Sequence, residues 1–313
     1  MNTLYFKYAV EVGKTGSITQ AADNLYMAQP NLSKAIRELE DTVGIEIFER
    51  TSKGVAPTKK GVEFLNHAKN ILAELEKLED LRLPDGSGNQ TLSIAIPRGS
   101  YISSCVTAFM SELDMSKPAS VKIKETNSVD AVNIVADGQF KFGIIRYKAE
   151  YEKYFLDFLK EKGMESQTVW DFKCIALMPE SHPLAGVDKI TLDDLKKYVE
   201  ILYGDMSVPY ISSSEQFKKD NDLDSLRHYI LLYDRCSQFD MLSSINSAFM
   251  LGSPVPDFLL ERYGLVQRAY SGHGRRHKDV LIYPSGYAFS QWDMKFLDML
   301  YAAKNAVAFK DYR

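Results

Sequence analysis

The chain has 313 residues, of which 45% are hydrophobic and 26% are charged, and its formal net charge is −4 at pH 7. This mixed composition has no low-complexity run and is typical of a globular protein. Three cysteines exclude a disulfide-stapled scaffold, and no run of 18 apolar residues or signal peptide is present. We therefore expect a cytoplasmic protein with no membrane partner.

The first strong pattern begins at residue 16 and predicts two short helices joined by a tight turn. Apolar residues of the first helix recur at spacings of three and four, at Ile18, Ala21, Ala22 and Leu25. Ser17 and Gln20 fit a capping box, which would start this helix. The short connection that follows is typical of a helix-turn-helix.

The second helix repeats the spacing and leaves one polar face free. Its apolar positions are Leu32, Ala35, Ile36 and Leu39, and Pro30 suits its first turn, where a missing N–H costs nothing. Its outer face consists of side chains able to donate to base edges and phosphates: Gln29, Asn31, Ser33, Lys34 and Arg37. This face predicts DNA reading. The alternative is a generic helical pair with a solvated polar face.

From residue 58 to about residue 81 the chain has no proline and one glycine, which predicts a helix of about 24 residues. Its apolar residues step by three or four and include Leu65, Ala68, Leu72 and Leu75. Such a narrow stripe predicts packing against another helix, most simply that of a second copy. The alternative is packing on the chain's own C-terminal domain. We expect a homodimer at least.

The segment 84–89 is rich in Pro, Gly and Asn and marks a domain boundary. Beyond it, strand-like runs alternate with helical segments, at 92–96, 121–123, 142–145, 174–178, 201–203, 229–233 and 280–283. This alternation predicts an α/β domain with mainly parallel sheets. Ligands of such sheets bind at the carboxyl ends of the strands.

The N-terminal pattern resembles LysR-type transcriptional regulators. The matching residues are Gly16-Ser17, Ala21-Ala22, Gln29-Pro30, Ser33, Ile36, Leu39-Glu40, Gly44 and Phe48-Glu49-Arg50. Residues 53–58 look like that family's wing, and residues 58–61 look like the start of its linker helix. The sequence departs from the family pattern at Ala9, Ala28 and Lys34, and a lysine cannot make the two-pronged contact of arginine with guanine.

The resemblance implies a role for each matching position. In the family the second helix enters the major groove and the wing touches the backbone. The implied base-edge contacts are Gln29, Pro30 and Ser33, with mixed contact by Lys34. The implied phosphate contacts are Arg37, Arg50, Lys53 and Thr58.

The resemblance also implies the domain plan. It predicts an all-α winged helix-turn-helix head over 1–58, a linker and dimerisation helix over 59–83 and a hinge over 84–90. Residues 91–313 would form an α/β two-lobed effector domain of periplasmic-binding-protein type. Lobe I would take about 91–165 and 272–313, and lobe II would take 166–271. The family suggests a tetramer as well as a dimer.

The family's effector cleft draws on positions that carry polar groups here. The turn after the first strand of this domain supplies Arg98, Gly99, Ser100 and Tyr101, while Ser128 opens a helix, and Arg146 and Tyr203 follow strand ends. Because helix starts attract anions and two arginines are present, we expect a small-molecule effector that is a carboxylate or another anion. The alternative is that both arginines form structural ion pairs.

Catalytic patterns find little support. The three cysteines have no CxxC spacing, and the five histidines are scattered along the chain. The densest histidine cluster is the segment 273–277, which we interpret as a polar loop. No P-loop, dinucleotide fingerprint or G-x-S-x-G elbow occurs. We predict no enzyme, cofactor or metal, but a sequence-specific DNA-binding transcription regulator controlled by its effector. The rivals are a sensor whose head binds protein, and an enzyme that uses the cleft.

Overall fold

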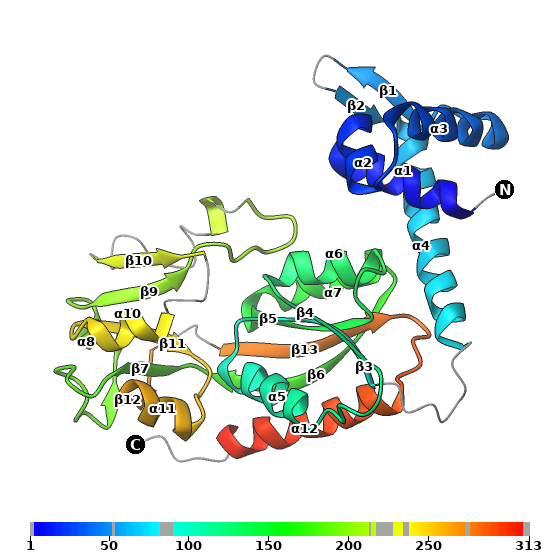
Figure 1. Cartoon of the computed structure of the whole chain (residues 1–313). Coiled ribbons are helices and arrows are strands. Elements are labelled where there is room, and N and C mark those ends of the chain that lie inside the picture. The colour runs from blue at the N-terminus through cyan, green and yellow to red at the C-terminus, as the bar shows by residue number, and fades with distance from the viewer. Residues whose placement is uncertain are drawn as a thin grey trace. The chain divides into compact units, whose positions relative to one another are not determined.

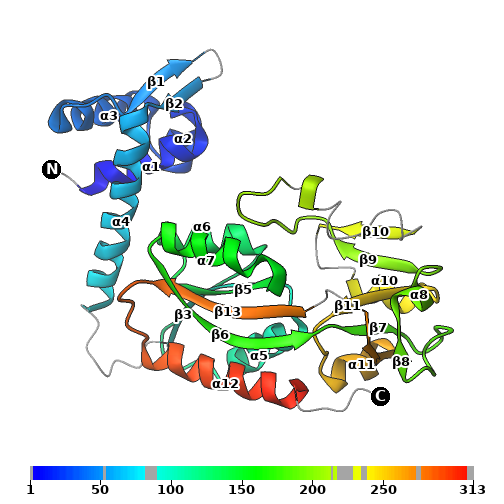
Figure 2. The same ribbon diagram turned by 180° about the vertical axis from the view of Figure 1, so that it is seen from behind.

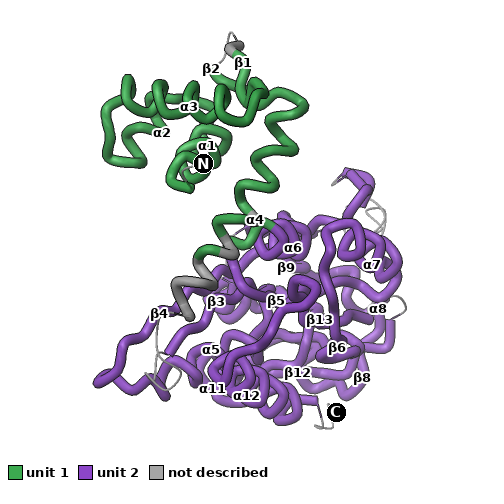
Figure 3. The backbone as a smooth tube through the Cα atoms, turned by 90° about the vertical axis from the view of Figure 1, so that its right-hand side faces the viewer, with its two compact units in different colours: residues 1–88, 137–139 green, residues 89–136, 140–313 purple. Residues whose placement is uncertain are grey.

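The structure is a computed structural model that describes residues 3–51, 54–81, 90–212, 214–216, 228–233, 238–272 and 276–308 (Figure 1). It divides into two compact units, residues 1–88 with 137–139 and residues 89–136 with 140–313 (Figure 3). Among the helices described, none combines the length and the apolar character that a membrane-spanning segment needs.

The first unit is a helical head with a two-stranded wing. Its elements are α1 (Thr3–Thr15), α2 (Ile18–Asn24), α3 (Gln29–Val43), β1 (Phe48–Thr51), β2 (Gly54–Pro57) and α4 (Lys59–Leu81). The strands β1 and β2 pair antiparallel. The core of this head includes Ala9, Val12, Leu32, Leu39 and Ile47, each fully buried. The predicted apolar faces of α2 and α3 thus meet α1, and the alanine at position 9 is part of this packing.

The helix ends follow the local chemistry of the chain. The Ser17 hydroxyl accepts a hydrogen bond from the N–H of Gln20, so the predicted N-cap is confirmed. The reciprocal half of the capping box is absent, because the Gln20 side chain donates to Asn24 instead. Helix α3 has Pro30 in its first turn and ends at Gly44, whose φ of 70° is the left-handed conformation that favours glycine.

The burial of helix α4 contradicts part of the predicted contact with a second chain. Its stripe residues Leu65 and Ala68 are only 7% and 1% exposed, and they pack in the core of the head. Leu72 is half-buried against the same core. Because α1 already covers this part of the stripe, Leu65 and Ala68 are not available to a second chain. Leu75 is half-buried, and Ile71 beside it is 41% exposed.

The second unit contains a five-stranded sheet in the order β4-β3-β5-β13-β6. Its strands are β3 (Gln90–Ile96), β4 (Ala119–Glu125), β5 (Phe142–Lys148), β6 (Met164–Lys173) and β13 (Arg276–Pro284). Strand β3 pairs parallel with β4 and β5, whereas β13 pairs antiparallel with β5 and β6.

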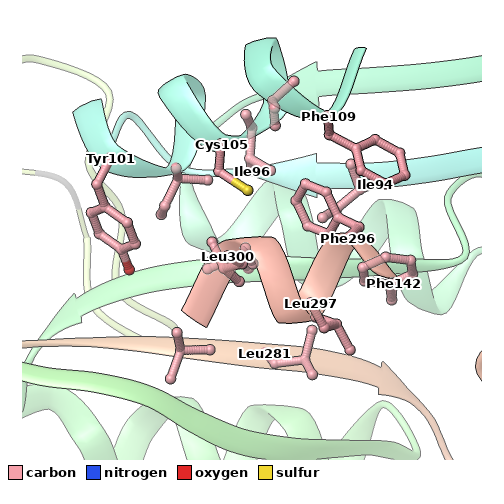
Figure 4. Close-up of a cluster of buried hydrophobic side chains, with 14 of the residues drawn as sticks. Ile94, Ile96, Tyr101, Cys105, Phe109, Phe142, Leu281, Phe296, Leu297 and Leu300 are labelled. Carbon is pink, nitrogen blue, oxygen red and sulfur yellow. The ribbon is translucent and has the colours of Figure 1, made fainter. Parts of the chain in front are cut away.

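Helices cover both faces of this sheet (Figures 1 and 2). They are α5 (Ser100–Ser111) and α12 (Gln291–Ala308) on one face, and α6 (Ser128–Ala136), the short η1 (Ala149–Tyr151) and α7 (Glu152–Glu161) on the other. Residues alternate between the two faces, as a strand requires: Ile144 packs towards α5 and α12, and Ile145 towards α6 and α7. Figure 4 shows Phe109, Phe142 and Phe296 together in the first of these clusters.

A six-stranded sheet in the order β10-β9-β11-β7-β12-β8 completes the unit. Its strands are β7 (Ile175–Pro179), β8 (Lys189–Ile190), β9 (Val199–Tyr203), β10 (Tyr229–Leu232), β11 (Ala248–Gly252) and β12 (Leu265–Tyr270). Its helices are α8 (Leu192–Leu195), α10 (Gln238–Ser244) and α11 (Asp257–Tyr263). Strand β7 pairs antiparallel with both of its neighbours.

Two sequence-based expectations are wrong here. The sheets are mixed rather than mainly parallel, because the chain returns to each sheet through strands that were not predicted, β6, β11 and β12. Strand β6 belongs to the first sheet, so the chain crosses to the second sheet at Cys174 and not at residue 166. The return crossing lies between Tyr270 and Arg276.

Candidate functional site

The outward face of α3 carries the polar side chains expected to read DNA. Gln29, Pro30, Asn31, Lys34 and Arg37 are exposed and Ser33 is half-buried. The Lys34 side chain is 78% exposed, with its Nζ 3.7 Å from the Glu38 carboxylate. An exposed pair at this spacing contributes only about 0.3–0.5 kcal/mol, so a phosphate could readily replace it.

Two acidic residues of α3 are engaged within the head. The Glu38 carboxylate accepts a hydrogen bond of 2.8 Å from the Tyr5 hydroxyl. The Glu40 carboxylate accepts the N–H groups of Ile47 and Phe48 at 2.7 and 3.0 Å. Glu40 thereby fixes the point at which the chain leaves α3 and enters the wing.

The wing is attached to the turn between α1 and α2. The N–H of Val55 donates to the carbonyl of Gly16 at 2.9 Å. Thr58, predicted to contact phosphate, caps α4: its hydroxyl donates to the Glu46 carbonyl and accepts the Gly61 N–H. The Arg50 side chain and Lys53 lie outside the described residues, so their phosphate contacts stay predictions.

Tyr26 is a candidate contact that the sequence did not reveal. It lies in the turn between α2 and α3 with φ of 53° and is 98% exposed. Nothing in the apolar spacing marks it, because its prominence comes from the left-handed backbone of the turn.

The second unit contains a cavity of about 110 Å³ lined by residues from both of its sheets. Four predicted effector residues line it: Arg98, Ser128, Arg146 and Tyr203. Its other lining residues are Pro97, Thr126, Asn127, Phe172, Met206, Ser207, Leu251, Gly252, Ser253 and His277. Ser100 lines an adjoining cavity of about 50 Å³.

Gly99 and Tyr101 are not among the residues that line these cavities, so their contact with an effector stays a prediction. Tyr101 is wholly buried, and its hydroxyl donates to the Asp279 carboxylate at 2.5 Å. Burial, with the nearby charge of Asp279, raises the pKa of Tyr101 well above its ordinary value. Tyr101 therefore belongs to the core beneath the cavity.

Arg146 is held by the carboxylate of Asp279. The Nε and Nη2 of Arg146 donate to the two Asp279 oxygens at 2.6 and 2.7 Å. Its Nη1 donates to the Ser253 hydroxyl, at 3.1 Å, which links the five-stranded sheet to the segment after β11. Burial lowers the pKa of Arg146, but the charge and hydrogen bonds of Asp279 outweigh it and the net shift is upward.

Arg98 makes the second link between the sheets. Its guanidinium donates to both carboxylate oxygens of Asp205, with an Nη2–Oδ2 distance of 2.8 Å, and to the Tyr233 carbonyl at 2.6 Å. It also lies 5.1 Å from the centre of the Tyr203 ring. Both arginines therefore form ion pairs, as the alternative interpretation expects, and their contact with an effector stays a prediction.

Comparison with known proteins supports the assignment of the head. The model of the bacterial regulatory helix-turn-helix proteins of the lysR family matches residues 5–62. These residues run from α1 into the first turn of α4. The head of the chain, residues 5–62, is therefore of the lysR-family helix-turn-helix type.

The curated relatives of this chain are named as transcriptional regulators. The transcriptional regulator AlsR of Bacillus subtilis is 25% identical over 197 residues, 63% of this chain and 62% of that protein. The regulator CysB of Burkholderia cenocepacia is 31% identical over 213 residues, 66% of this chain and 64% of that protein. The chain thus spans less than two thirds of the length of these two relatives.

Solved structures show the same fold over nearly the whole chain. A full-length OxyR variant from Pseudomonas aeruginosa has a TM-score of 0.59 at 16% identity, covering 98% of this chain and 96% of that one. Full-length CbnR in a complex with its target DNA has a TM-score of 0.56 at 17% identity, covering 97% of this chain and all of that one. The winged head and the two-sheet second unit therefore share the fold of these two solved structures.

In this chain, several lining residues of the cavity come from elements that were not predicted. Phe172 lies in β6, and Leu251 and Gly252 lie in β11. His277 belongs to β13 rather than to a polar loop. Its Nδ1 lies 3.1 Å from the Sγ of Cys174, and its ring stacks on that of Phe172.

Two of the three cysteines lie in described segments, and both are buried thiols outside any disulfide. They are Cys105 in α5 and Cys174 at the crossing between the sheets, whereas Cys236 lies outside the described residues. Over the described parts of the chain no cluster of three or more His, Cys, Asp or Glu could hold a metal ion.

Proposed function

We propose that the chain is a sequence-specific DNA-binding transcription regulator whose action depends on a small molecule bound in the cavity of its second unit. The observation that carries the proposal is the polar face of α3, exposed on a helix-turn-helix head that matches the lysR family. The names of the relatives support a regulator rather than an enzyme. Because its target is DNA, we place it in the cytoplasm.

The recognition function is tested by selecting binding sites from a random DNA pool with the full chain. The variant Ser33→Ala with Lys34→Ala removes two side chains of α3, and Ser116→Ala with Lys117→Ala is a matched control in the second unit, where both residues are exposed. We expect inverted half-sites with the wild type and the control and their loss in the α3 variant. A pool without enrichment for the wild type would contradict DNA reading and favour a head that binds protein.

The role of the cavity follows from its position between the two sheets. Ligand entry would change the contacts of Arg98 with Asp205 and of Arg146 with Ser253, which join the sheets. A ligand that binds two arrangements unequally shifts their populations. A change in the geometry of paired heads on DNA is the output that we propose.

We also propose a homo-oligomer, a dimer or a tetramer, because paired heads are needed to read two half-sites. With Leu65 and Ala68 buried in the head, the contact would use the part of α4 around Ile71, Leu72 and Leu75. Light scattering on the full chain tests this. We expect a dimer or tetramer mass for the wild type and for Met115→Asp, a control at a residue that is 87% exposed, and a smaller mass for Leu75→Asp.

A further inference from the structure

We propose that the cavity takes an uncharged small molecule and that Asp205 is the residue that excludes anions from it. This inference rests on the proposed function, because it assigns a ligand class to the same cavity. It replaces our expectation of an anionic effector, which was based on the presence of two arginines.

Each nitrogen of Arg146 already donates to an acceptor of the protein. Two of its nitrogens donate to Asp279, and the third, Nη1, donates to the hydroxyl of Ser253 and to the carbonyl of Arg98. Asp279 itself is fully buried. Removing that carboxylate from Arg146 would leave a buried charge unpaired, which costs several kcal/mol, so a ligand anion cannot replace it cheaply.

Arg98 is matched in the same way. Both terminal nitrogens of Arg98 donate to the carboxylate of Asp205, and Nη2 also donates to the carbonyl of Tyr233. Burial lowers the pKa of the Arg98 guanidinium, but Asp205, with a smaller contribution from Glu125, raises it more. The two arginines thus face three carboxylates, and the cavity has no surplus positive charge from them.

The strap, residues 205–211, keeps Asp205 in place. It follows β9 of the six-stranded sheet, yet Val208 is 5% exposed and packs in the cluster beneath α6 and α7 of the other sheet. The Ser207 hydroxyl donates to Asn127 at 3.0 Å, and the Tyr210 hydroxyl donates to Glu161 at 2.5 Å. Because residues 207, 208 and 210 are anchored on the five-stranded side, we expect Asp205 to move only when the strap moves with it.

The remaining lining suits a small uncharged ring. Phe172, Leu251 and Met206 supply apolar surface, while Ser128 and Ser253 supply hydroxyls. A dry cavity of about 150 Å³ holds benzene in another protein, and the present one is about 110 Å³ with a second of about 50 Å³ beside it. Benzamide and benzoate share one shape and differ in charge, so they are a suitable probe pair.

The test measures the Kd of both probes by calorimetry with the full chain at constant ionic strength. We expect the wild type to bind benzamide at least tenfold more tightly than benzoate. In Asp205→Asn, which frees the Arg98 guanidinium, benzoate affinity should rise at least tenfold and benzamide affinity should change less than threefold. Asp188→Asn, at an exposed position, is the matched control and should behave as the wild type.

A wild type that binds benzoate as tightly as benzamide would overturn the proposal. So would a benzoate affinity that does not rise in Asp205→Asn, including the case in which neither protein binds it. If Asp205→Asn does not fold, Asp205→Ser is the second variant, and we expect the same rise in benzoate affinity for it. Site selection on DNA is scored separately, so probe binding as expected without DNA enrichment would contradict the regulator function alone.

Discussion

The Nε of Arg146 lies 2.6 Å from one carboxylate oxygen of Asp279, and its Nη2 lies 2.7 Å from the other. The same carboxylate accepts the hydroxyl of Tyr101 at 2.5 Å, although the Asp279 side chain has no exposed surface. A buried ion pair of this geometry is stable only as a pair, because each charge compensates the desolvation of the other.

We therefore expect Asp279→Leu, which leaves Arg146 unpaired, to lower the free energy of unfolding by about 3–5 kcal/mol. The double variant Arg146→Met with Asp279→Leu should recover most of that loss, since it removes both charges. Urea unfolding of the full chain measures each value, with Asp188→Leu as a surface control. A single variant within about 1 kcal/mol of the wild type would show that the pair does not stabilise the fold.

The start of α4 requires glycine at position 61. A Cβ added to Gly61 would lie 1.9 Å from the carbonyl oxygen of Ile47, a backbone atom that cannot rotate away. We expect Gly61→Ala to cost about 1–3 kcal/mol or more. Thermal unfolding measures it, and Gly186→Ala is the control, because nothing lies within 4 Å of its added Cβ. Equal unfolding temperatures for both variants would contradict this close approach.

Cys105 gives a prediction about pH. Burial raises the pKa of its thiol from about 9 to about 12. Between these two pH values the thiol loses its proton in the unfolded chain but keeps it in the folded chain. The contribution of the thiol to the stability of the fold is therefore fully present below pH 9 and is lost as the pH rises towards 12. We expect the free energy of unfolding of the wild type to fall more steeply above pH 9 than that of Cys105→Ala. Parallel slopes in urea unfolding at pH 8 to 10.5 would contradict it.

The head was predictable because its signals are local. Apolar spacing placed the buried faces of α2 and α3, Ser17 marked a helix start, and the run from residue 59 gave the length of α4. The apolar stripe on α4 also predicted correctly that these residues are buried. The spacing alone does not indicate whether they pack against the same chain or against a second one. Leu65 and Ala68 meet α1 of the same chain.

The cavity was predictable only in part, because it is assembled from distant segments. Helix starts and strand ends indicated Arg98, Ser128, Arg146 and Tyr203. Asp205 and Asp279 lie 107 and 133 residues from the arginines they pair with, and no local pattern links them. Considered without these carboxylates, the two arginines predict a site for an anion. Considered with them, the arginines favour the uncharged ligand that we propose.

Two cations on the outward face of α3, Lys34 and Arg37, are expected to make different contacts with DNA, one with bases and the other with phosphates. Lys34 lies near the start of α3, where base edges are read, whereas Arg37 lies one turn further on. A phosphate contact weakens binding to every sequence, and its loss lowers the slope of log affinity against log salt by about 0.9. We expect Arg37→Ala to reduce affinity for selected and random DNA by the same factor, with that change of slope.

Lys34→Ala should reduce affinity for the selected sequence more than for random DNA, because a lost base contact costs discrimination of about 1–3 kcal/mol. Fluorescence anisotropy at four salt concentrations measures both quantities, with Lys117→Ala as the control outside the head. Equal losses on both DNAs for Lys34→Ala would assign this lysine to phosphate contact and leave sequence reading to Gln29, Asn31 and Ser33.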